Sequence, residues 1–201
     1  MIKAIIFDLG GVLFTNGTKK FVNSISKRHG IEREKVEEIM NGDLGTLYRE
    51  AKITRDEFWE RALNELNINE SVDKLEQEWI DGYELIEGTK TLIQELSKKY
   101  KIYFLSDNVK ERVSKINERY NFMDWFEDGV FSHEVGVRKP NPEIYKITLS
   151  KINTKPEEAV FIDDKPEMLA PAQETGMLTF LFESPEKLQE DLIKNNLLEK
   201  R

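Results

Sequence analysis

Four separate segments of this 201-residue chain carry polar side chains of the kinds that catalysis uses. Asp8 follows a short apolar run, and Ser-Asp-Asn at 106–108 follows a second. Lys139 comes shortly after a third run, and Asp163 with Asp164 ends a fourth. In an open parallel sheet, ligands bind outside the carboxyl ends of the strands. If these runs are parallel strands, a carboxylate, a hydroxyl, an amine and an acidic pair converge on one site.

The charges of this set indicate a divalent cation and a phosphate substrate. Asp8, Asp163 and Asp164 carry three negative charges when ionised, and crowded carboxylates raise one another's pKa values. Mg²⁺ favours sites with one or two carboxylates plus phosphate oxygens. With that cation and Lys139 screening the repulsion, Asp8 can attack phosphorus to give an aspartyl-phosphate, while Ser106 and nearby backbone N–H groups bind the phosphoryl oxygens.

Each motif alone also has a plainer structural explanation. Asp8 is compatible with a turn cap, residues 106–108 and 163–164 with helix N-caps, and Lys139 with a solvated loop lysine. The predicted site therefore depends on all four segments meeting at one edge of a sheet. For His133, at the end of a predicted strand, we expect packing or hydrogen bonding rather than catalysis.

The elements that must position these residues are predicted from hydrophobic patterning. Five apolar, β-rich runs have no polar alternation, which is typical of parallel strands buried on both faces. They are Ile2–Phe7, Ile102–Leu105, Val130–Ser132, Ala159–Ile162 and Leu178–Phe182. Helical patterns at 89–99, at 110–120 and after Pro142 separate the later runs. We predict an α/β fold with a Rossmann-like parallel sheet and helices on both faces.

One long stretch interrupts this alternation. Residues 15–86 show helical patterns and no strand. Gly30 and Gly42 are typical of residues that end helices. Thr54 and Glu57 form a capping-box pattern before an amphipathic run. We therefore predict a small all-helical cap at 15–86, inserted after the first strand, and a core domain made of 1–14 and 87–201.

The motifs resemble, in order, those of the haloacid dehalogenase-like superfamily. The matching stretches are FDLGGVL (7–13), FLSDN (104–108), EVGVRKPNP (134–142) and FIDDKPE (161–167). Their spacing and the early helical insert resemble subfamily I, which has a small helical cap. The sequence looks most like the α-D-glucose-1-phosphate phosphatase type, which also has Asp-Leu-Gly in the first motif.

The resemblance implies a metal site and a nucleophile. Asp8 would be the nucleophile and a Mg²⁺ ligand, and Gly10 would offer its backbone carbonyl to the metal. Asp164 would ligate Mg²⁺ directly, and Asp163 directly or through water. The implied activity is a phosphatase reaction on a small phosphorylated metabolite, with sugar phosphates among the candidates.

The resemblance also implies a phosphate-binding set. Ser106 would bind phosphate together with the amides of Asp107 and Asn108. Lys139 would stabilise the phosphate and orient the nucleophile. The chain departs from the family at Gly10, where most phosphatases have an Asp that acts as general acid and base. A catalytically weak protein that binds a phosphorylated ligand or a partner protein is therefore the alternative.

Other functional classes fit less well. A receiver-like phosphoacceptor lacks a long insert after the first strand, and a haloacid dehalogenase needs no acidic pair for a metal.

The net charge is −8, with 30 basic and 38 acidic residues interleaved, so we expect no nucleic-acid partner. There is no cysteine to form a disulfide or a thiolate site. The N-terminal apolar run is too short for a signal peptide or membrane span, so we expect a cytoplasmic protein without a membrane partner.

Overall fold

A computed structural model describes residues 1–200 and contains one parallel sheet of five strands in the order β3-β2-β1-β4-β5. The strands are β1 (Ala4–Phe7), β2 (Lys101–Ser106), β3 (Asp128–Phe131), β4 (Ala159–Asp163) and β5 (Leu178–Leu181). Each coincides with a predicted strand, although Ser132 begins a short helix, α8 (Ser132–Val135), instead of ending β3. The predicted α/β fold is confirmed.

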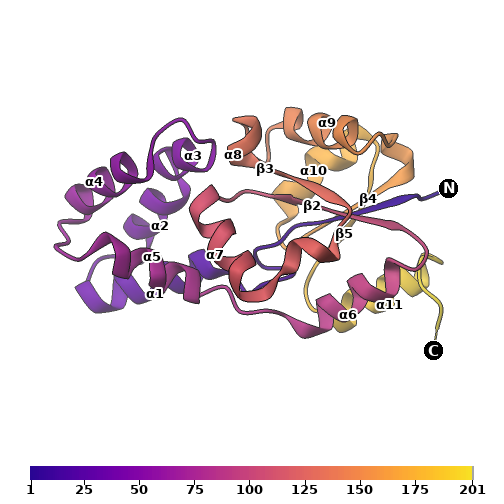
Figure 1. The fold of residues 1–201 in the computed structure, drawn as a ribbon, viewed down its shortest axis with the longest axis horizontal. Coiled ribbons are helices and arrows are strands. Elements are labelled where there is room, and N and C mark those ends of the chain that lie inside the picture. Colours follow the sequence, from indigo (N-terminus) through magenta and orange to yellow (C-terminus); the bar gives the residue numbers. More distant parts are fainter. Residues whose placement is uncertain (201) are drawn as a thin grey trace.

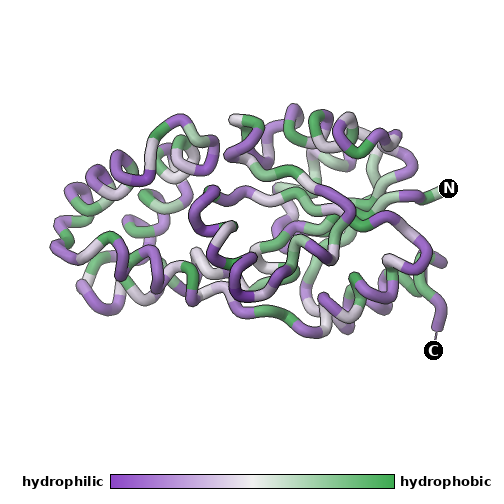
Figure 2. The backbone as a smooth tube through the Cα atoms, viewed as in Figure 1, coloured by the Kyte–Doolittle hydropathy of each residue, from purple (hydrophilic) through white to green (hydrophobic). Residues whose placement is uncertain are grey.

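Helices cover both faces of the sheet (Figure 1). On one face the apolar side chains of the strands pack with α6 (Glu87–Leu96), α7 (Lys110–Tyr120) and α11 (Pro185–Lys194). On the other they pack with α9 (Pro142–Lys151) and α10 (Pro166–Thr175). Two short 3₁₀ helices, Phe122–Trp125 and Pro156–Glu158, precede β3 and β4. Figure 2 shows hydrophobic residues concentrated along the central strands, as expected for a sheet buried between two layers.

The central position of β1 explains where the functional residues meet. Phe7 pairs with Phe104 of β2 on one side and with Ile162 of β4 on the other. The backbone N–H of Asp8 then donates to Ile162 O at 2.9 Å, which extends the ladder by one residue. The carboxyl ends of three neighbouring strands are thereby held in register, and the residues that follow them lie at the same edge of the sheet.

One strand departs from the predicted burial on both faces. β5 lies at the edge of the sheet, and its end residues Leu178 and Leu181 are 38% and 36% exposed. An edge strand has a single neighbour, so its apolar run does not imply burial on both faces. Patterning alone does not distinguish an apolar edge strand from a central one.

The stretch between β1 and α6 contains five helices and no strand, as predicted. They are α1 (Gly17–His29), α2 (Arg33–Asn41), α3 (Asp43–Arg49), α4 (Arg55–Leu66) and α5 (Val72–Asp81). The capping box is present, because Thr54 Oγ1 accepts from Glu57 N–H and the Glu57 carboxylate accepts from Thr54 N–H. Phe21 stacks on Trp79 with ring centroids 4.9 Å apart, and Trp59 packs edge-on against both rings. We call α1–α5 the helical insert.

The helical insert is joined to the sheet by two paired linkers and a buried contact. Thr15 N–H donates to Glu84 O and Ile86 N–H donates to Leu13 O, both at 2.8 Å, so the two linkers lie side by side. The fully buried Arg112 of α7 stacks on Trp79 of the insert, with its guanidinium carbon 3.6 Å from a ring centroid. These contacts hold the insert beside the carboxyl end of the sheet (Figure 1).

None of the helices in residues 1–200 has the length and apolar character needed to cross a bilayer.

Candidate active site

Lys139 lies at the centre of a buried charge network at the carboxyl end of the sheet. Its ammonium nitrogen is 2.8 Å from Asp8 Oδ1 and 2.6 Å from Asp163 Oδ2, and it donates to Leu105 O at 3.2 Å. The three charged side chains are almost completely buried. The structure thus brings together the predicted residues of the first, third and fourth motifs.

Asp164 completes an acidic cluster with Asp8 and Asp163. One carboxylate oxygen from each of the three residues lies within 4.8 Å of the others. Asp163 is held by Lys139 and by the backbone N–H of Lys165, whereas Asp164 Oδ1 is buried with no hydrogen-bond partner among the described residues. A buried, unpaired carboxylate oxygen is costly unless a ligand satisfies it.

Gly11 makes room for this cluster. Its φ is +101°, a conformation that favours glycine, and a Cβ atom there would lie 2.3 Å from Asp164 Oδ2. The Asp164 carboxylate therefore packs directly against the Gly11 backbone. Gly11 of the first motif therefore has to be a glycine because Asp164 of the fourth motif occupies the space of a side chain.

The electrostatics of the site reflect the excess of acid. Burial raises the pKa of Asp8 to about 7; Asp163 and Asp164 add to the increase, and Lys139 opposes it. Burial also raises the pKa of Asp164, with Asp163 as the next cause. Burial disfavours the Lys139 ammonium, but Asp163 and Asp8 outweigh it and raise its pKa well above 10.5. Without a cation, the carboxyl group of Asp8 thus titrates near neutral pH.

The last residue of β2 and the two residues after it have distinct surroundings. Ser106 is 3% exposed, and its hydroxyl has no hydrogen-bond partner among residues 1–200. The Asp107 carboxylate accepts from the backbone N–H of Lys139 at 3.1 Å and from Arg138 Nε at 3.4 Å. Its side chain thus holds the loop that carries Lys139. Asn108 Oδ1 accepts from Arg112 Nη1 at 3.2 Å.

His133 makes packing and hydrogen-bonding contacts of the kind that its position at the end of a predicted strand led us to expect. Its ring stacks on Phe131, and Nδ1 lies 2.7 Å from Asn108 O.

Gly10 is the residue at the position of the usual acid/base Asp. A Cβ atom there would meet only Tyr83 Cε1, at 3.4 Å. The backbone at Gly10 therefore leaves space for a side chain that this sequence lacks.

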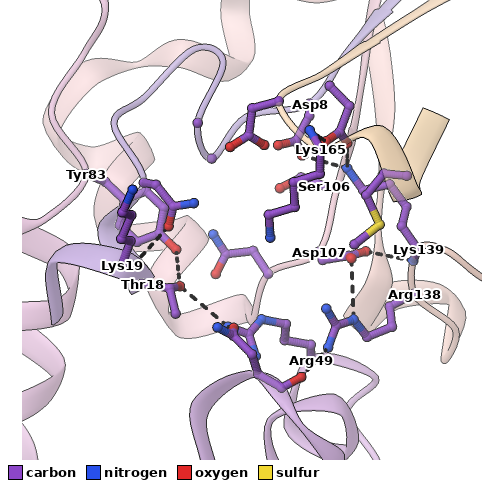
Figure 3. Close-up of a pocket in the computed structure, with 18 of the residues that line it drawn as sticks. Asp8, Thr18, Lys19, Arg49, Tyr83, Ser106, Asp107, Arg138, Lys139 and Lys165 are labelled. Atoms are coloured by element: carbon purple, nitrogen blue, oxygen red, sulfur yellow. Dashed lines mark hydrogen bonds and ion pairs between the residues drawn. The ribbon is translucent and has the colours of Figure 1, made fainter. Parts of the chain in front are cut away.

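A cavity of about 570 Å³ opens over the charge network. Its lining includes several residues that the sequence analysis did not select: Tyr83, Arg49, Arg138 and Lys165. Figure 3 shows Lys165 extending from the end of β4 toward the cavity, and Arg49 with Arg138 on the wall away from Asp8. Arg138 and Lys165 lie within the third and fourth motif stretches, beside Lys139 and Asp164, and this position was the available signal for them. Arg49 and Tyr83 belong to the helical insert and its linker, where no motif marks them.

Comparisons with known proteins agree with this geometry. The sequence pattern of the haloacid dehalogenase-like hydrolases matches residues 2–176. A D-ribitol-5-phosphate phosphatase of Bacteroides thetaiotaomicron is 26% identical over 189 residues, covering 90% of this chain and 91% of that protein. A sesquiterpene phosphatase of Aspergillus oryzae is 28% identical over 179 residues, covering 88% and 87%.

Solved structures of proteins in this family have a similar fold. A family enzyme from Bacteroides thetaiotaomicron, crystallised with magnesium and inorganic phosphate, is 25% identical with a TM-score of 0.78 over 92% of this chain and 96% of that chain. A 2-haloacid dehalogenase of Pseudomonas syringae, 17% identical with a TM-score of 0.66, covers 96% of this chain and 99% of its own and shares the fold. The family pattern spans most of the sequence, and this chain belongs to the haloacid dehalogenase-like hydrolases.

Proposed function

We propose that this protein is a Mg²⁺-dependent phosphomonoester hydrolase that acts on a small phosphorylated metabolite through an aspartyl-phosphate at Asp8. The observation that carries this proposal is the buried cluster of Asp8, Asp163 and Asp164 around the Lys139 ammonium, at the base of the cavity. The phosphatase names of two relatives and the magnesium and phosphate in a related structure support the same reaction class.

The acidic cluster fits a hard cation. All the candidate ligands are oxygens, which Mg²⁺ prefers, and Asp164 Oδ1 is buried without a partner. We assign Asp8, Asp164 and the Gly10 carbonyl as ligands, with Asp163 contributing directly or through water. When bound, Mg²⁺ neutralises the carboxylates and screens the phosphoryl oxygens from them.

Each residue of the site then has a separate role in the reaction. Asp8, oriented by Lys139, attacks phosphorus, and the bond between phosphorus and the leaving oxygen breaks. Ser106 donates its free hydroxyl to a phosphoryl oxygen, together with the backbone amides of Asp107 and Asn108. Water next attacks phosphorus in the aspartyl-phosphate, which releases inorganic phosphate and restores the Asp8 carboxylate.

Gly10 determines how the leaving group departs. With no carboxyl side chain at this position, the leaving oxygen departs with its negative charge or takes a proton from water or from the substrate itself. General acid catalysis contributes roughly 10²–10⁴-fold. We infer that the enzyme acts best on phosphate compounds with good leaving groups, such as sugar 1-phosphates, aryl phosphates and acyl phosphates.

We propose that residues 15–86 act as a cap and residues 1–14 with 87–201 as the catalytic core. Residues of both parts line the cavity, including Thr18 and Arg49 from the helical insert. A cap that closes the cavity excludes water from the aspartyl-phosphate until the leaving group has gone.

The proposal is tested by a phosphatase screen with sugar phosphates, nucleotides and phosphorylated acids, with Mg²⁺ and with a chelator. We expect turnover of several small phosphate esters that requires Mg²⁺. Mg²⁺-dependent binding without turnover of any ester would favour the catalytically weak alternative instead.

A further inference from the structure

Two guanidinium groups lie together on the cavity wall away from the carboxylates (Figure 3). Arg49 ends α3 of the helical insert, and Arg138 precedes Lys139 in the core. Both contact Asn41: Arg49 Nη2 donates to its Oδ1 at 3.2 Å, and Arg138 Nη1 donates to its backbone oxygen at 3.3 Å. Two cations are thus held side by side where the helical insert meets the core.

Arg49 has no acidic partner among the described residues, although it is only 5% exposed. Its guanidinium donates to uncharged oxygens alone. These are Met40 O (2.6 Å), Gly45 O (3.2 Å), Thr18 Oγ1 (3.5 Å) and Asn41 Oδ1 (3.2 Å). Burial, together with the nearby Arg138 and Arg112, lowers the pKa of Arg49 to about 9. Hydrogen bonds to neutral oxygens satisfy its donors but do not neutralise its charge, and the nearby Asp107 carboxylate compensates that charge only in part.

Arg138 adds to this excess of positive charge, and its own charge is only partly compensated. Its ion pair with Asp107 Oδ2 is long, at 3.4 Å, and Asp107 also accepts from the backbone N–H of Lys139. Arg138 Nη1 donates to Thr46 Oγ1 at 2.9 Å, and no ion pair or hydrogen bond within residues 1–200 uses Nη2. By contrast, Arg33, which lines the same cavity, is neutralised by Glu37 at 2.6 Å.

We propose that Arg49 and Arg138 bind a second anionic group of the substrate, so that the enzyme selects phosphorylated acids or bisphosphates over neutral phosphate esters. This inference rests on the proposed phosphatase function and names its substrate class. Planar guanidinium groups match the oxygens of carboxylates and phosphates and bind them in bidentate fashion. A cavity of about 570 Å³ has room for a small molecule that reaches from the acidic cluster to this pair.

The position of the pair also links binding to the arrangement of the two parts. An anion between Arg49 and Arg138 would contact the helical insert on one side and the Lys139 loop on the other. It would therefore favour the arrangement in which the insert covers the cavity, because its binding energy is available only when both guanidinium groups are close.

The direct test is calorimetry on the full-length Asp8→Asn protein with Mg²⁺, since this variant should bind esters without consuming them. One pair of probes is 3-phosphoglycerate and glycerol 3-phosphate, and the other is fructose 1,6-bisphosphate and fructose 6-phosphate. We expect the member with the second anionic group to bind about tenfold tighter or more in at least one pair. The pair that shows it identifies a carboxylate or a second phosphate. Equal or weaker binding of that member in both pairs would overturn the inference.

Variants locate the effect. Arg138→Gln and Arg49→Lys, each combined with Asp8→Asn, should reduce the affinity ratio toward one, whereas Arg33→Gln should keep it. A ratio that persists in whichever of the two variants folds would show that other residues bind the second anion and would overturn the assignment. Turnover of p-nitrophenyl phosphate by the wild type is measured separately. Its absence counts against the phosphatase function, whereas the binding ratios count for or against this inference.

Discussion

The ammonium nitrogen of Lys139 lies 2.8 Å from Oδ1 of Asp8, although the two residues are 131 positions apart in the chain. The pair is buried, and Asp163 lies on the other side of the same nitrogen at 2.6 Å. One positive charge therefore faces two carboxylates, and Asp164 adds a third nearby. This imbalance suits a site that is completed by a cation and a phosphate.

Lys139→Met should destabilise the metal-free protein, because it leaves Asp8 and Asp163 buried without their cation. Removing one partner of a buried ion pair costs about 3–5 kcal/mol. Urea unfolding at pH 8 should show a loss of this size. The loss should be smaller at pH 5, where Asp8 takes up a proton. Equal losses at both pH values would contradict the assigned pairing.

Asp164→Ala should weaken Mg²⁺ binding more than Asp163→Ala does. Asp163 already has Lys139 and the Lys165 backbone N–H as partners, whereas Asp164 Oδ1 has none. Loss of a direct ligand should exceed the ~10–100-fold loss that is typical of outer-shell partners. Calorimetry with Mg²⁺ measures both variants, and the reverse order would exclude Asp164 as the main ligand of the pair.

The stability of the metal-free protein should fall as the pH rises from 5 to 8. Folding raises the pKa of Asp8 from 3.8 to about 7, so between these values the folded state holds a proton that the unfolded state releases. The resulting stability is complete below about pH 4 and is lost as the pH rises through 7. The raised pKa of Asp164 acts in the same direction.

Urea unfolding in a chelator should therefore show a decrease of roughly 3 kcal/mol over this range. Asp8→Asn removes the main titrating group and is the matched control, which should flatten the dependence. Mg²⁺ should stabilise the wild type more at pH 8 than at pH 5, because protons compete for the same carboxylates. A wild-type stability that rises over this range would contradict the assignment.

Gly10→Asp should increase turnover of esters with poor leaving groups. The backbone has space for the side chain, since only Tyr83 Cε1 lies within 4 Å of the new Cβ position, at 3.4 Å. A carboxylic acid there can protonate the leaving oxygen, which the wild type leaves to solvent or substrate. The measurement is kcat/KM against leaving-group pKa for both proteins. A flat line for the wild type would show that another group supplies the proton.

The sequence was sufficient to predict the sheet, the helical insert and the four motif segments, because each leaves a local signal. Asp8 follows β1, Ser106 and Asp163 end β2 and β4, and Lys139 lies in the loop after α8. Parallel strands bring such residues to one edge of the sheet. The pairing of Lys139 with both Asp8 and Asp163 follows from that topology. The close approach of Asp164 to Gly11 was less visible, because it depends on the conformation of a single turn.

The cavity wall was not predictable in the same way. Arg49 stands among charged residues at the end of a helix, where the usual expectation is exposure, yet the packing of α2 and α3 buries it. Tyr83 and Arg49 reach the cavity only because the helical insert lies over the sheet edge. β5 is the converse case. Its apolar run suggested burial on both faces, but its position at the edge of the sheet leaves Leu178 and Leu181 exposed. These features depend on tertiary packing, which leaves no periodic signal in the sequence.

The most direct test of the account is chemical identification of the phosphorylated residue. The wild type is quenched with acid during turnover of p-nitrophenyl phosphate with Mg²⁺, and borohydride then reduces any aspartyl-phosphate to homoserine before digestion and mass spectrometry. We predict homoserine at Asp8 alone, none when substrate is omitted, and turnover reduced by several orders of magnitude in Asp8→Asn. Continued turnover with no reducible residue at Asp8, or near-wild-type activity of Asp8→Asn, would contradict the mechanism.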